Sequence, residues 1–442
     1  MNILVLHGFK DLSLARNTSL NHLYAFERYA PEHEYVYHCA YWHVTEQLKQ
    51  INFCAIILDT SFMSQRTVRP RKLLDELRAK YTWLRYSRAI KLALPQDEYD
   101  ECDVLDEWLE EMGVDVIGTV VGHRETLYPR MLHKAEFIEL LTGYVDYEEL
   151  LRIESFVKPM ASRTVDIGYR GRALPYYFGR LGQQKTEIYR QFKKATAGKR
   201  IITDMKISSN GALFGDEWRK FLCNSRFTLG LLSGSSMRDP RGKIRDQLEK
   251  LLLERPNTTF DEAEREIFPS EDGQYIFSAI SPRIFEAAAG RSCQILIEGH
   301  YAEGFKANLH YIPLKPDYSN VDEILERLND HKEAELIADR CYDLLIRDQR
   351  YHYGSFVSIV LGKIQELQKN SRREIMRKTV FRKMLKQHQR NLSMRGKGAS
   401  FREDIKQKII IIANSNPILL SVFNVLLRVW KALLSGGNNV QR

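Results

Sequence analysis

A single acidic residue stands inside a small, apolar segment in the second half of the chain. Residues 281–290 read Ser-Pro-Arg-Ile-Phe-Glu-Ala-Ala-Ala-Gly, and an apolar strand over 294–297 follows almost at once. A buried carboxylate is costly unless it accepts hydrogen bonds, for example from the paired hydroxyl groups of a sugar. Glu286 is therefore either a hydroxyl-binding group or one half of an ordinary ion pair with Arg283 or Arg291.

Cations gather near the start of the same half. Arg170 and Arg172 follow a predicted strand, and Arg180 and Lys185 occupy the pattern Gly-Arg-Leu-x-x-x-Lys. Fixed cationic groups at such positions stabilise the negative charge that develops on a leaving diphosphate, and they do so without a metal ion. The alternative is that these side chains are solvated charges on a loop and on a helix face.

A run of small residues, 233–236, follows another predicted strand. Backbone N–H groups in such a turn can bind a phosphate or a base, which makes Ser235 and Ser236 candidate ligand contacts. No Gly-Lys-Ser/Thr follows, so the run is not a Walker loop. A plain turn explains the same residues.

Two groups in the first half are candidate general bases. His7 ends the first predicted strand, and Asp97 with Glu98 ends a strand over 89–94. A base at either place would deprotonate an acceptor hydroxyl. His7 could instead be a packed or capping histidine, and the two acids could simply open a solvated turn. No Asp-x-Asp pair follows a strand, so we expect no obligatory metal.

The elements that must position these residues alternate along the chain. In the first half we predict strands over 2–6, 35–40, 54–58, 89–94 and 114–121, with helices over 18–28 and 104–112. In the second half we predict strands over 164–168, 200–205, 226–232, 294–297 and 311–314, with helices over 186–195, 216–223 (N-cap Asp216), 283–289, 321–328, 333–345 and 353–368. Such alternation predicts two parallel, doubly wound sheets, with ligands at the carboxyl ends of the strands.

Four segments of the second half, 167–172, 179–185, 232–236 and 281–290, together resemble the donor domain of bacterial GT-B glycosyltransferases. They are similar to families of surface-polysaccharide clusters and to spore-maturation-type relatives. The resemblance covers residues 160–365, and the first 150 residues only by fold pattern. It implies that Glu286 accepts hydrogen bonds from the donor ribose, and that Arg170, Arg172, Lys185, Arg283, Ser235 and Ser236 bind the donor. The family's other acid is missing, because Ser278 stands at its position.

The charge is concentrated in the C-terminal part of the chain. Residues 371–442 hold 16 Lys and Arg but 3 Asp and Glu, whereas the other 370 residues have a net charge of −4 within a total of +9. Together with the apolar stretch 418–434, this basic tail predicts peripheral binding to an anionic membrane surface. A helix that docks on the protein body or forms a dimer contact is the alternative, and we expect no nucleic-acid partner. The six cysteines are widely spaced, as is typical of a reducing cytoplasm.

These observations predict an α/β protein of the GT-B class. Its parts would be an acceptor-side Rossmann-like domain (1–155), a nucleotide-sugar donor domain with a crossing helix (160–365) and the basic tail (371–442). The expected activity is metal-independent transfer from a nucleotide sugar to a glycan or lipid-linked acceptor in polysaccharide biosynthesis. It would occur at the cytoplasmic face of the membrane, with no cofactor besides the donor. A non-catalytic scaffold of the same fold is the alternative function.

Overall fold

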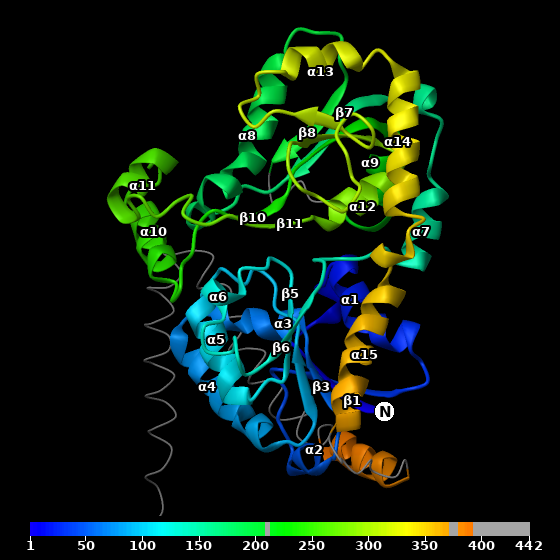
Figure 1. The fold of residues 1–442 in the computed structure, drawn as a ribbon. Helices are drawn as coiled ribbons and strands as arrows, with labels where there is room; N and C mark the ends of the chain where they lie inside the picture. The colour runs from blue at the N-terminus through cyan, green and yellow to red at the C-terminus, as the bar shows by residue number, and fades with distance from the viewer. Residues whose placement is uncertain (208–212, 371–378, 392–442) are drawn as a thin grey trace, which may run out of the picture. The chain divides into compact units, whose positions relative to one another are not determined.

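The computed structural model describes residues 1–207, 213–370 and 379–391 (Figure 1). The chain divides into two compact units. The larger comprises residues 1–41 and 52–375, and the smaller comprises 42–51 with 376–442. Two parallel sheets lie in the larger unit. We call the part around the first sheet, residues 1–41, 52–144 and 353–370, the first lobe, and residues 145–352 the second lobe.

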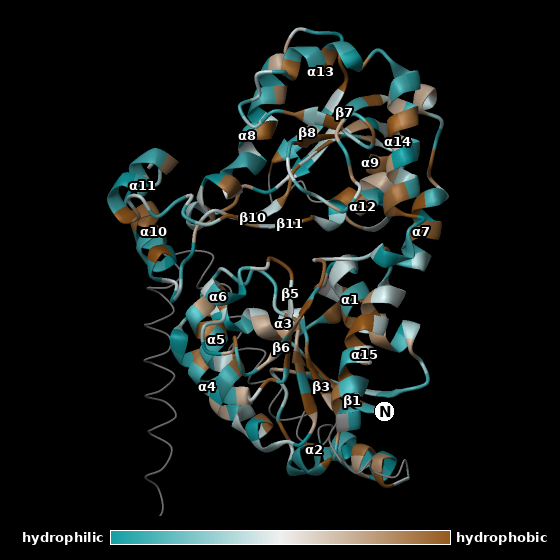
Figure 2. Cartoon of the chain, viewed as in Figure 1, coloured by the Kyte–Doolittle hydropathy of each residue, from teal (hydrophilic) through white to brown (hydrophobic). Residues whose placement is uncertain are grey.

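The first lobe is built on six parallel strands in the order β2-β1-β3-β4-β5-β6. The strands are β1 (Asn2–His7), β2 (Glu34–Cys39), β3 (Ala55–Leu58), β4 (Ile90–Ala93), β5 (Val116–Thr119) and β6 (Glu136–Glu139). Helices between them include α1 (Asn17–Tyr29), α3 (Thr60–Met63), α4 (Arg71–Tyr81), α5 (Cys102–Met112) and α6 (Arg124–Leu127). The central strands are buried along their whole length, and Figure 2 shows hydrophobic residues on β3. Continuous apolar runs of this kind are expected where helices cover both faces of a parallel sheet.

The second lobe has five parallel strands in the order β13-β12-β9-β7-β8. The strands are β7 (Val165–Gly171), β8 (Thr203–Ile207), β9 (Ser225–Gly230), β12 (Cys293–Ile297) and β13 (Ile312–Leu314). The helices include α8 (Gly179–Ala195), α9 (Gly215–Asn224), α12 (Pro282–Ala289), α13 (Val321–Arg327) and α14 (His331–Leu345). Both sheets place the carboxyl ends of their strands at one edge, where the ligands of such sheets bind.

The predicted strands and helices are present, with differences at their ends, but several elements were not predicted, among them α4 and the helix α7 (Tyr147–Glu154). Strand β6 was not predicted, α8 begins at Gly179 rather than at 186, and β7 continues to Gly171 rather than ending at 168. The predicted N-cap of α9 is wrong. Phe214 occupies that position, and Asp216 lies in the first turn, where its carboxylate binds Arg219.

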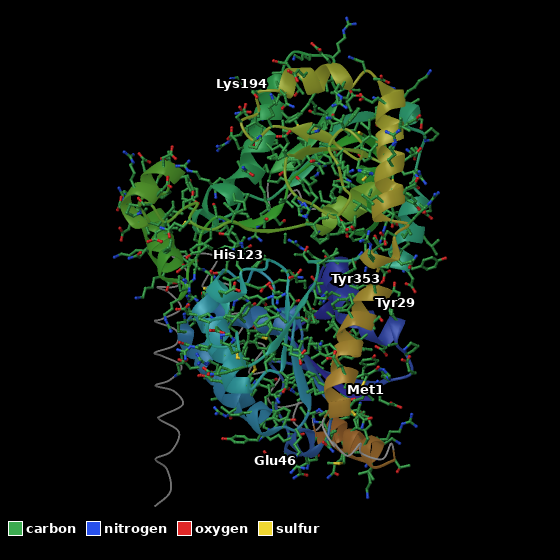
Figure 3. All side chains as sticks on the ribbon, viewed as in Figure 1. Met1, Tyr29, Glu46, His123, Lys194 and Tyr353 are labelled. Atoms are coloured by element: carbon green, nitrogen blue, oxygen red, sulfur yellow. The ribbon has the colours of Figure 1, made fainter. Side chains whose placement is uncertain are left out.

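The chain passes between the lobes twice, and the two passages are hydrogen-bonded to each other. The amide of Val145 donates to the carbonyl of Tyr351 over 2.7 Å, and the amide of Tyr353 donates back to Val145 over 3.1 Å. Helix α15 (Tyr353–Asn370) then packs into the core of the first lobe, where Phe356 is fully buried with Ile3 and Phe26. Tyr353 also stacks on Tyr29 of α1, as Figure 3 shows. The final helix of the larger unit therefore belongs to the first lobe.

Residues 236–280 form an insertion in the second lobe that the sequence did not predict. It follows β10 (Ser233–Ser235), contains α10 (Lys243–Glu254) and α11 (Phe260–Ile267), and ends in β11 (Phe277–Ala279), which pairs antiparallel with β10. Gly234 is needed in this hairpin, because its φ is +142° and a Cβ would lie 1.8 Å from the carbonyl oxygen of Phe277. The insertion also reaches the first lobe, where the amide of Glu101 donates to the carbonyl of Asp239 over 2.9 Å.

The smaller unit joins α2 (Glu46–Gln50) to a helical stretch over 379–391. The Thr45 hydroxyl lies 2.7 Å from Nδ1 of His388, and the Asn391 amide donates to Gln47 over 2.9 Å. The predicted membrane-binding tail, 371–442, lies outside the described residues except for this stretch. Within the described part of the chain, every helix is too short or too polar to cross a bilayer.

Candidate functional site

Three cations come together at the carboxyl end of the second sheet. Lys185 lies on α8, Arg283 on the first turn of α12, and Arg172 directly after β7. The pKa of Lys185 is lowered to about 8, chiefly by burial and in addition by the charges of Arg283 and Arg172. The carboxylate of Asp97, from the first lobe, acts in the opposite direction. These four side chains therefore lie within electrostatic range of one another.

The three cations have no carboxylate ion-pair partner among the residues that the structure describes. In the described part of the chain, Lys185, Arg172 and Arg283 form no ion pair within 4.0 Å. Arg283 instead donates to the backbone carbonyl of Arg170, and its guanidinium lies 5.8 Å from the ring centroid of Trp218. An unbalanced cluster of positive charge at this edge of the sheet can stabilise a bound anion.

Glu286 follows Arg283 by one helical turn and is partly buried. Its Oε2 accepts a hydrogen bond of 3.0 Å from the indole Nε1 of Trp218. Burial raises the pKa of Glu286, while Arg283 and the indole N–H favour the ionised form. The alternative of an ion pair with Arg283 or Arg291 is wrong, because Arg291 binds Asp339 and Glu286 forms no ion pair with a described residue. No described group donates to Oε1, so this oxygen is available to a ligand.

Arg170 was predicted to bind the donor from a loop, and this prediction is wrong. The residue lies inside β7 and is 8 % exposed. Its guanidinium donates to the carboxylate and the carbonyl of Asp204, both over 2.7 Å, and it lies 4.3 Å from the ring centroid of Phe221. Side chains of a strand point alternately to its two faces, and that of Arg170 is directed to Asp204. The carboxylate of Asp204 therefore already balances its charge.

Ser235 and Ser236 are also bound internally, so their predicted contact with a donor is wrong for the hydroxyl groups. Both are buried. The Ser235 hydroxyl donates to the carbonyl of Met237 over 2.9 Å, and the Ser236 hydroxyl donates to Asp272 over 2.6 Å. Ser236 Oγ in turn accepts from the amide of Leu181, which caps the start of α8.

The start of α8 is therefore closed by the insertion. The amide of Arg180 donates to the carboxylate of Asp272 over 3.1 Å, where a phosphate would otherwise find free N–H groups. The Arg180 guanidinium binds Glu264 and Asp261 of α11. Of the two cations in the Gly-Arg-Leu-x-x-x-Lys pattern, only Lys185 is without an acidic partner among the described residues.

Asp97 is the exposed acid at the carboxyl end of β4. Its φ is +48°, and its carboxylate accepts a hydrogen bond of 2.8 Å from the Tyr99 hydroxyl. The carbonyl of Asp97 accepts from the buried guanidinium of Arg66 over 2.6 Å. The neighbouring Glu98 is fully buried and holds the start of the next loop, since it accepts from the Thr119 hydroxyl and the Val120 amide. The structure thus fixes the backbone of Asp97 and leaves its side chain exposed, where its charge acts on Lys185.

His7 lies at the carboxyl end of β1, but it is 3 % exposed. Its Nδ1 accepts from the amide of Phe9 over 3.3 Å, and burial lowers its pKa although the nearby Asp59 acts against this. Asp59 is itself buried and caps α3 through the amide of Ser61. A solvent-borne acceptor does not reach His7 in this arrangement, whereas Asp97 is accessible.

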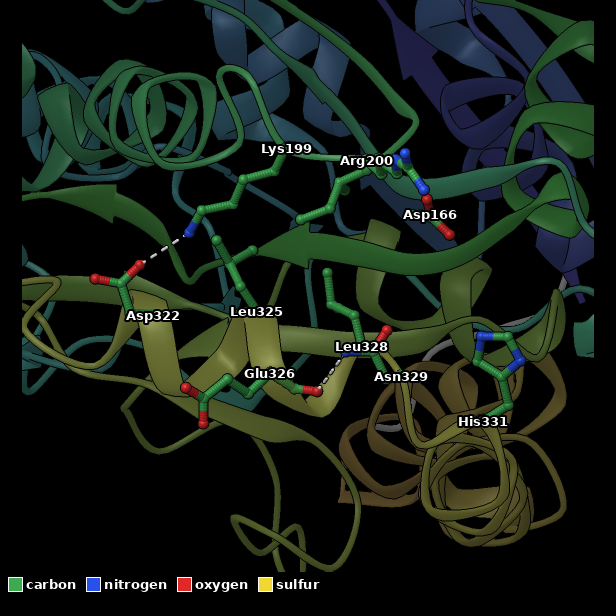
Figure 4. A pocket seen from close by; sticks show the side chains of 10 residues that line it. Asp166, Lys199, Arg200, Asp322, Leu325, Glu326, Leu328, Asn329 and His331 are labelled. Atoms are coloured by element: carbon green, nitrogen blue, oxygen red, sulfur yellow. Dashed lines mark hydrogen bonds and ion pairs between the residues drawn. The ribbon is translucent and has the colours of Figure 1, made fainter.

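A cavity of about 510 Å³ opens at the opposite edge of the second sheet (Figure 4). It is formed before β8 and beside the end of α13, and its lining includes Lys199, Arg200, Asp322 and His331. Lys199 is paired with Asp322 over 3.1 Å. Because ligands of parallel sheets bind at the carboxyl ends of the strands, this cavity is not the candidate site. In the described ranges, no group of three or more His, Cys, Asp or Glu side chains is arranged to hold a metal ion.

The sequence did not identify Trp218 or Asp272, which complete the site and close α8. Their partners lie 68 and 92 residues away in the chain, so no local spacing connects them. The signal for Trp218 was its place on a predicted helix, where an indole that is only partly buried needs a partner for its N–H group.

Known structures identify the architecture. An alpha-glucosyltransferase in complex with UDP-glucose and DNA containing an abasic site aligns with a TM-score of 0.50 and 10% identity, over 82% of this chain and 98% of that one. The chain has the GT-B fold. HepE from Anabaena, in complex with UDP-glucose, has a TM-score of 0.44 and 10% identity, over 84% of this chain and 100% of that one. A glycosyltransferase from Rickettsia africae has a TM-score of 0.40 and 12% identity, over 84% and 99%.

The GT-B fold agrees with the class predicted from the sequence. No protein-family model matches the chain, and no curated protein matches it in sequence. The comparisons therefore concern the architecture. A fold does not by itself determine a function. Any functional argument for this GT-B chain therefore rests on the chemistry of the residues that follow β4 and β7 and of those on α12.

Proposed function

We propose that the protein is a glycosyltransferase that moves a sugar from a nucleotide-sugar donor to a glycan or lipid-linked acceptor. The observation that carries the proposal is the cluster of Lys185, Arg283 and Arg172, cations that form no ion pair with a described residue and lie within electrostatic range of Asp97. When the glycosidic bond breaks, negative charge develops on the nucleoside diphosphate. Preorganised cations stabilise this charge more strongly in the transition state than in the ground state.

The remaining residues have complementary roles in this proposal. The free Oε1 of Glu286 accepts a hydrogen bond from a donor ribose hydroxyl. Asp97 removes the proton from the acceptor hydroxyl in an inverting reaction, because it is exposed and lies on the lobe opposite the cations. His7, buried at the end of β1, is the less suitable base.

Donor binding tests the proposal directly. A thermal-shift and calorimetric panel of UDP-, GDP-, CMP- and dTDP-sugars should show one donor that raises the apparent stability, since a ligand of the native state stabilises it. UDP-glucose is the first to test, because the aligned alpha-glucosyltransferase was solved with it. Glu286→Ala should weaken nucleotide binding about tenfold while the fold is kept. Unchanged nucleotide affinity in this variant would remove Glu286 from the site.

Metal independence is part of the proposal. If the three cations alone neutralise the leaving group, transfer should persist in excess EDTA and should not increase when Mg²⁺ or Mn²⁺ is added. Loss of transfer in EDTA, with recovery on addition of a divalent ion, would contradict it.

We further propose that the enzyme works in surface-polysaccharide biosynthesis, as a peripheral protein at the cytoplasmic face of the membrane. The support is the basic charge of residues 371–442. Deleting residues 392–442 leaves in place the 379–391 helix that contacts Thr45 and Gln47. This variant should no longer float with anionic vesicles. Competition with mixed-sequence DNA at physiological salt tests the predicted lack of a nucleic-acid partner, since DNA binding would outcompete the vesicles.

One observation favours the second candidate, a non-catalytic scaffold with the GT-B fold. Asp272 and Ser236 occupy the N–H groups at the start of α8, and Ser278 replaces an acid of the resembled family. A scaffold would bind no nucleotide sugar. Slow release of nucleoside diphosphate from one donor of the panel would exclude it.

A further inference from the structure

Trp218 lies on α9 and contacts Phe221 of the same helix and two charged residues of α12. Its indole stacks on Phe221, with the ring centroids 5.4 Å apart and the planes inclined by 22°. Its Nε1 donates to Oε2 of Glu286 over 3.0 Å. An indole has a single N–H donor and no acceptor, so this hydrogen bond fixes which carboxylate oxygen turns toward the tryptophan.

The same aromatic pair supports the cation of α12. The guanidinium of Arg283 lies 5.8 Å from the centroid of Trp218 and donates to the carbonyl of Arg170. The guanidinium of Arg170 lies 4.3 Å from the centroid of Phe221. Glu286 and Arg283 are therefore held by one connected set of side chains, in which Trp218 is the residue that contacts both.

This arrangement limits what Glu286 can bind. A carboxylate that receives both hydroxyl groups of a ribose in a bidentate manner presents both of its oxygens to them. In this protein the indole N–H of Trp218 occupies one of the two acceptor sites of Oε2, whereas no described residue donates to Oε1, so Oε1 has both of its acceptor sites left for a ligand. We propose that Trp218 is a positioning residue that makes Glu286 a one-oxygen acceptor, so that the site recognises one of the two ribose hydroxyl groups of the nucleoside diphosphate. This inference rests on the proposed donor function.

The experiment compares nucleotide binding to the full chain by calorimetry. The ligands are the diphosphate that the donor panel selects, UDP first, and its 2′-deoxy and 3′-deoxy forms. The wild type should bind one deoxy form about tenfold more weakly than UDP, because one charged hydrogen bond is lost, and the other form within about twofold of UDP. This arm needs no variant.

The second arm uses Trp218→Phe, which keeps the aromatic stack and removes the N–H group. In this variant UDP should bind about tenfold more weakly, and the difference between the two deoxy forms should fall to within about twofold. The matched control is Trp83→Phe, because the indole nitrogen of Trp83 is buried without a hydrogen-bond partner. This control should leave both the affinity and the discrimination at the wild-type values.

A pH profile separates positioning from packing. The indole N–H favours the ionised carboxylate, so its removal should shift the acidic limb of UDP binding to higher pH in Trp218→Phe and leave it in place in Trp83→Phe. Equal losses for both deoxy forms in the wild type, or wild-type discrimination in Trp218→Phe, would overturn the inference and leave the proposed function intact. Failure of the wild type to bind any nucleotide of the panel would overturn the proposed function itself.

Discussion

Arg180 and Lys185 lie five residues apart on α8, and their surroundings differ completely. The Arg180 guanidinium is 60 % exposed, yet it contacts the carboxylates of Asp261, Glu264 and Asp272. Lys185 is more deeply placed, forms no ion pair with a described residue, and has two cations near it, against which the charge of Asp97 acts. Exposure alone would have selected Arg180 as the ligand-binding group. The comparison teaches that the balance of charge around a cation, and not its accessibility, marks it as a phosphate-binding candidate.

The two candidate bases of the first lobe differ in exposure instead, because Asp97 is exposed and His7 is buried, and Asp97→Asn tests this difference with the largest expected effect. If Asp97 removes the acceptor proton, turnover should fall at least 100-fold, in the range that general bases contribute, while the donor dissociation constant stays within about threefold. Steady-state transfer and calorimetric binding measure the two quantities. His7→Asn is the comparison variant, and a larger loss of turnover there, in a folded protein, would make His7 the base.

Exchanging the two cations of α8 sharpens the comparison itself. Lys185→Met should weaken binding of the nucleoside diphosphate about 100-fold, because a partly desolvated charge next to the phosphates is lost. Arg180→Met should change this affinity by less than about twofold, since the Arg180 guanidinium is already paired with acidic residues of the insertion. Titration calorimetry measures the dissociation constant of the nucleoside diphosphate for both variants. Similar losses in the two would show that the insertion does not sequester Arg180.

Arg170 and Arg172 offer the same contrast in terms of stability. Arg170→Met leaves the half-exposed Asp204 without its partner, so the free energy of unfolding should fall by about 1–3 kcal/mol in a denaturant titration. Arg172→Met removes an exposed, unpaired charge and should change stability by less than about 0.5 kcal/mol, while it weakens nucleotide binding. The reverse pattern would return Arg170 to the donor site.

The smallest expected effect is a dependence on pH. The pKa of Lys185 is lowered to about 8 from 10.5, so nucleotide affinity should decline severalfold as pH rises through about 8. Stability has the opposite sign, because between about 8 and 10.5 the unfolded chain holds a proton that the folded chain has released. Lys185→Arg should abolish both trends, since a guanidinium stays charged in this range. Binding curves from pH 7 upward measure the effect.

Local pattern predicted most of the architecture, because alternating strands and amphipathic helices carry their own periodicity. It failed where a longer-range partner decided the outcome. The extension of β7 to Gly171 depends on its pairing with β8, and that pairing turns Arg170 toward Asp204. The insertion was missed because the two strands that bound it, β10 and β11, have three residues each and its contacts are distant in the chain. The acid that closes α8 was missed with it.

For the candidate site, the sequence predicted the residue types better than it predicted their hydrogen-bond partners and neighbours. The charge of Arg283 acts on both Lys185 and Glu286, whereas Ser236 and Arg170 are engaged by internal partners, Asp272 and Asp204. Five residues correspond to about 140° around a helix, so Arg180 and Lys185 face different neighbours although one sequence pattern contains both. Spacing alone does not show which neighbours those are.

The paired passages at Val145 and Tyr353 have a practical consequence for engineering. Backbone hydrogen bonds join the two ends of residues 145–352. The second lobe is therefore a continuous segment whose two ends are adjacent in space. It can be exchanged for the equivalent half of another protein with the GT-B fold through two cuts at neighbouring points, with no linker to span a distance. Chimaeras joined at these two points would show whether residues 145–352 determine the specificity for the donor sugar.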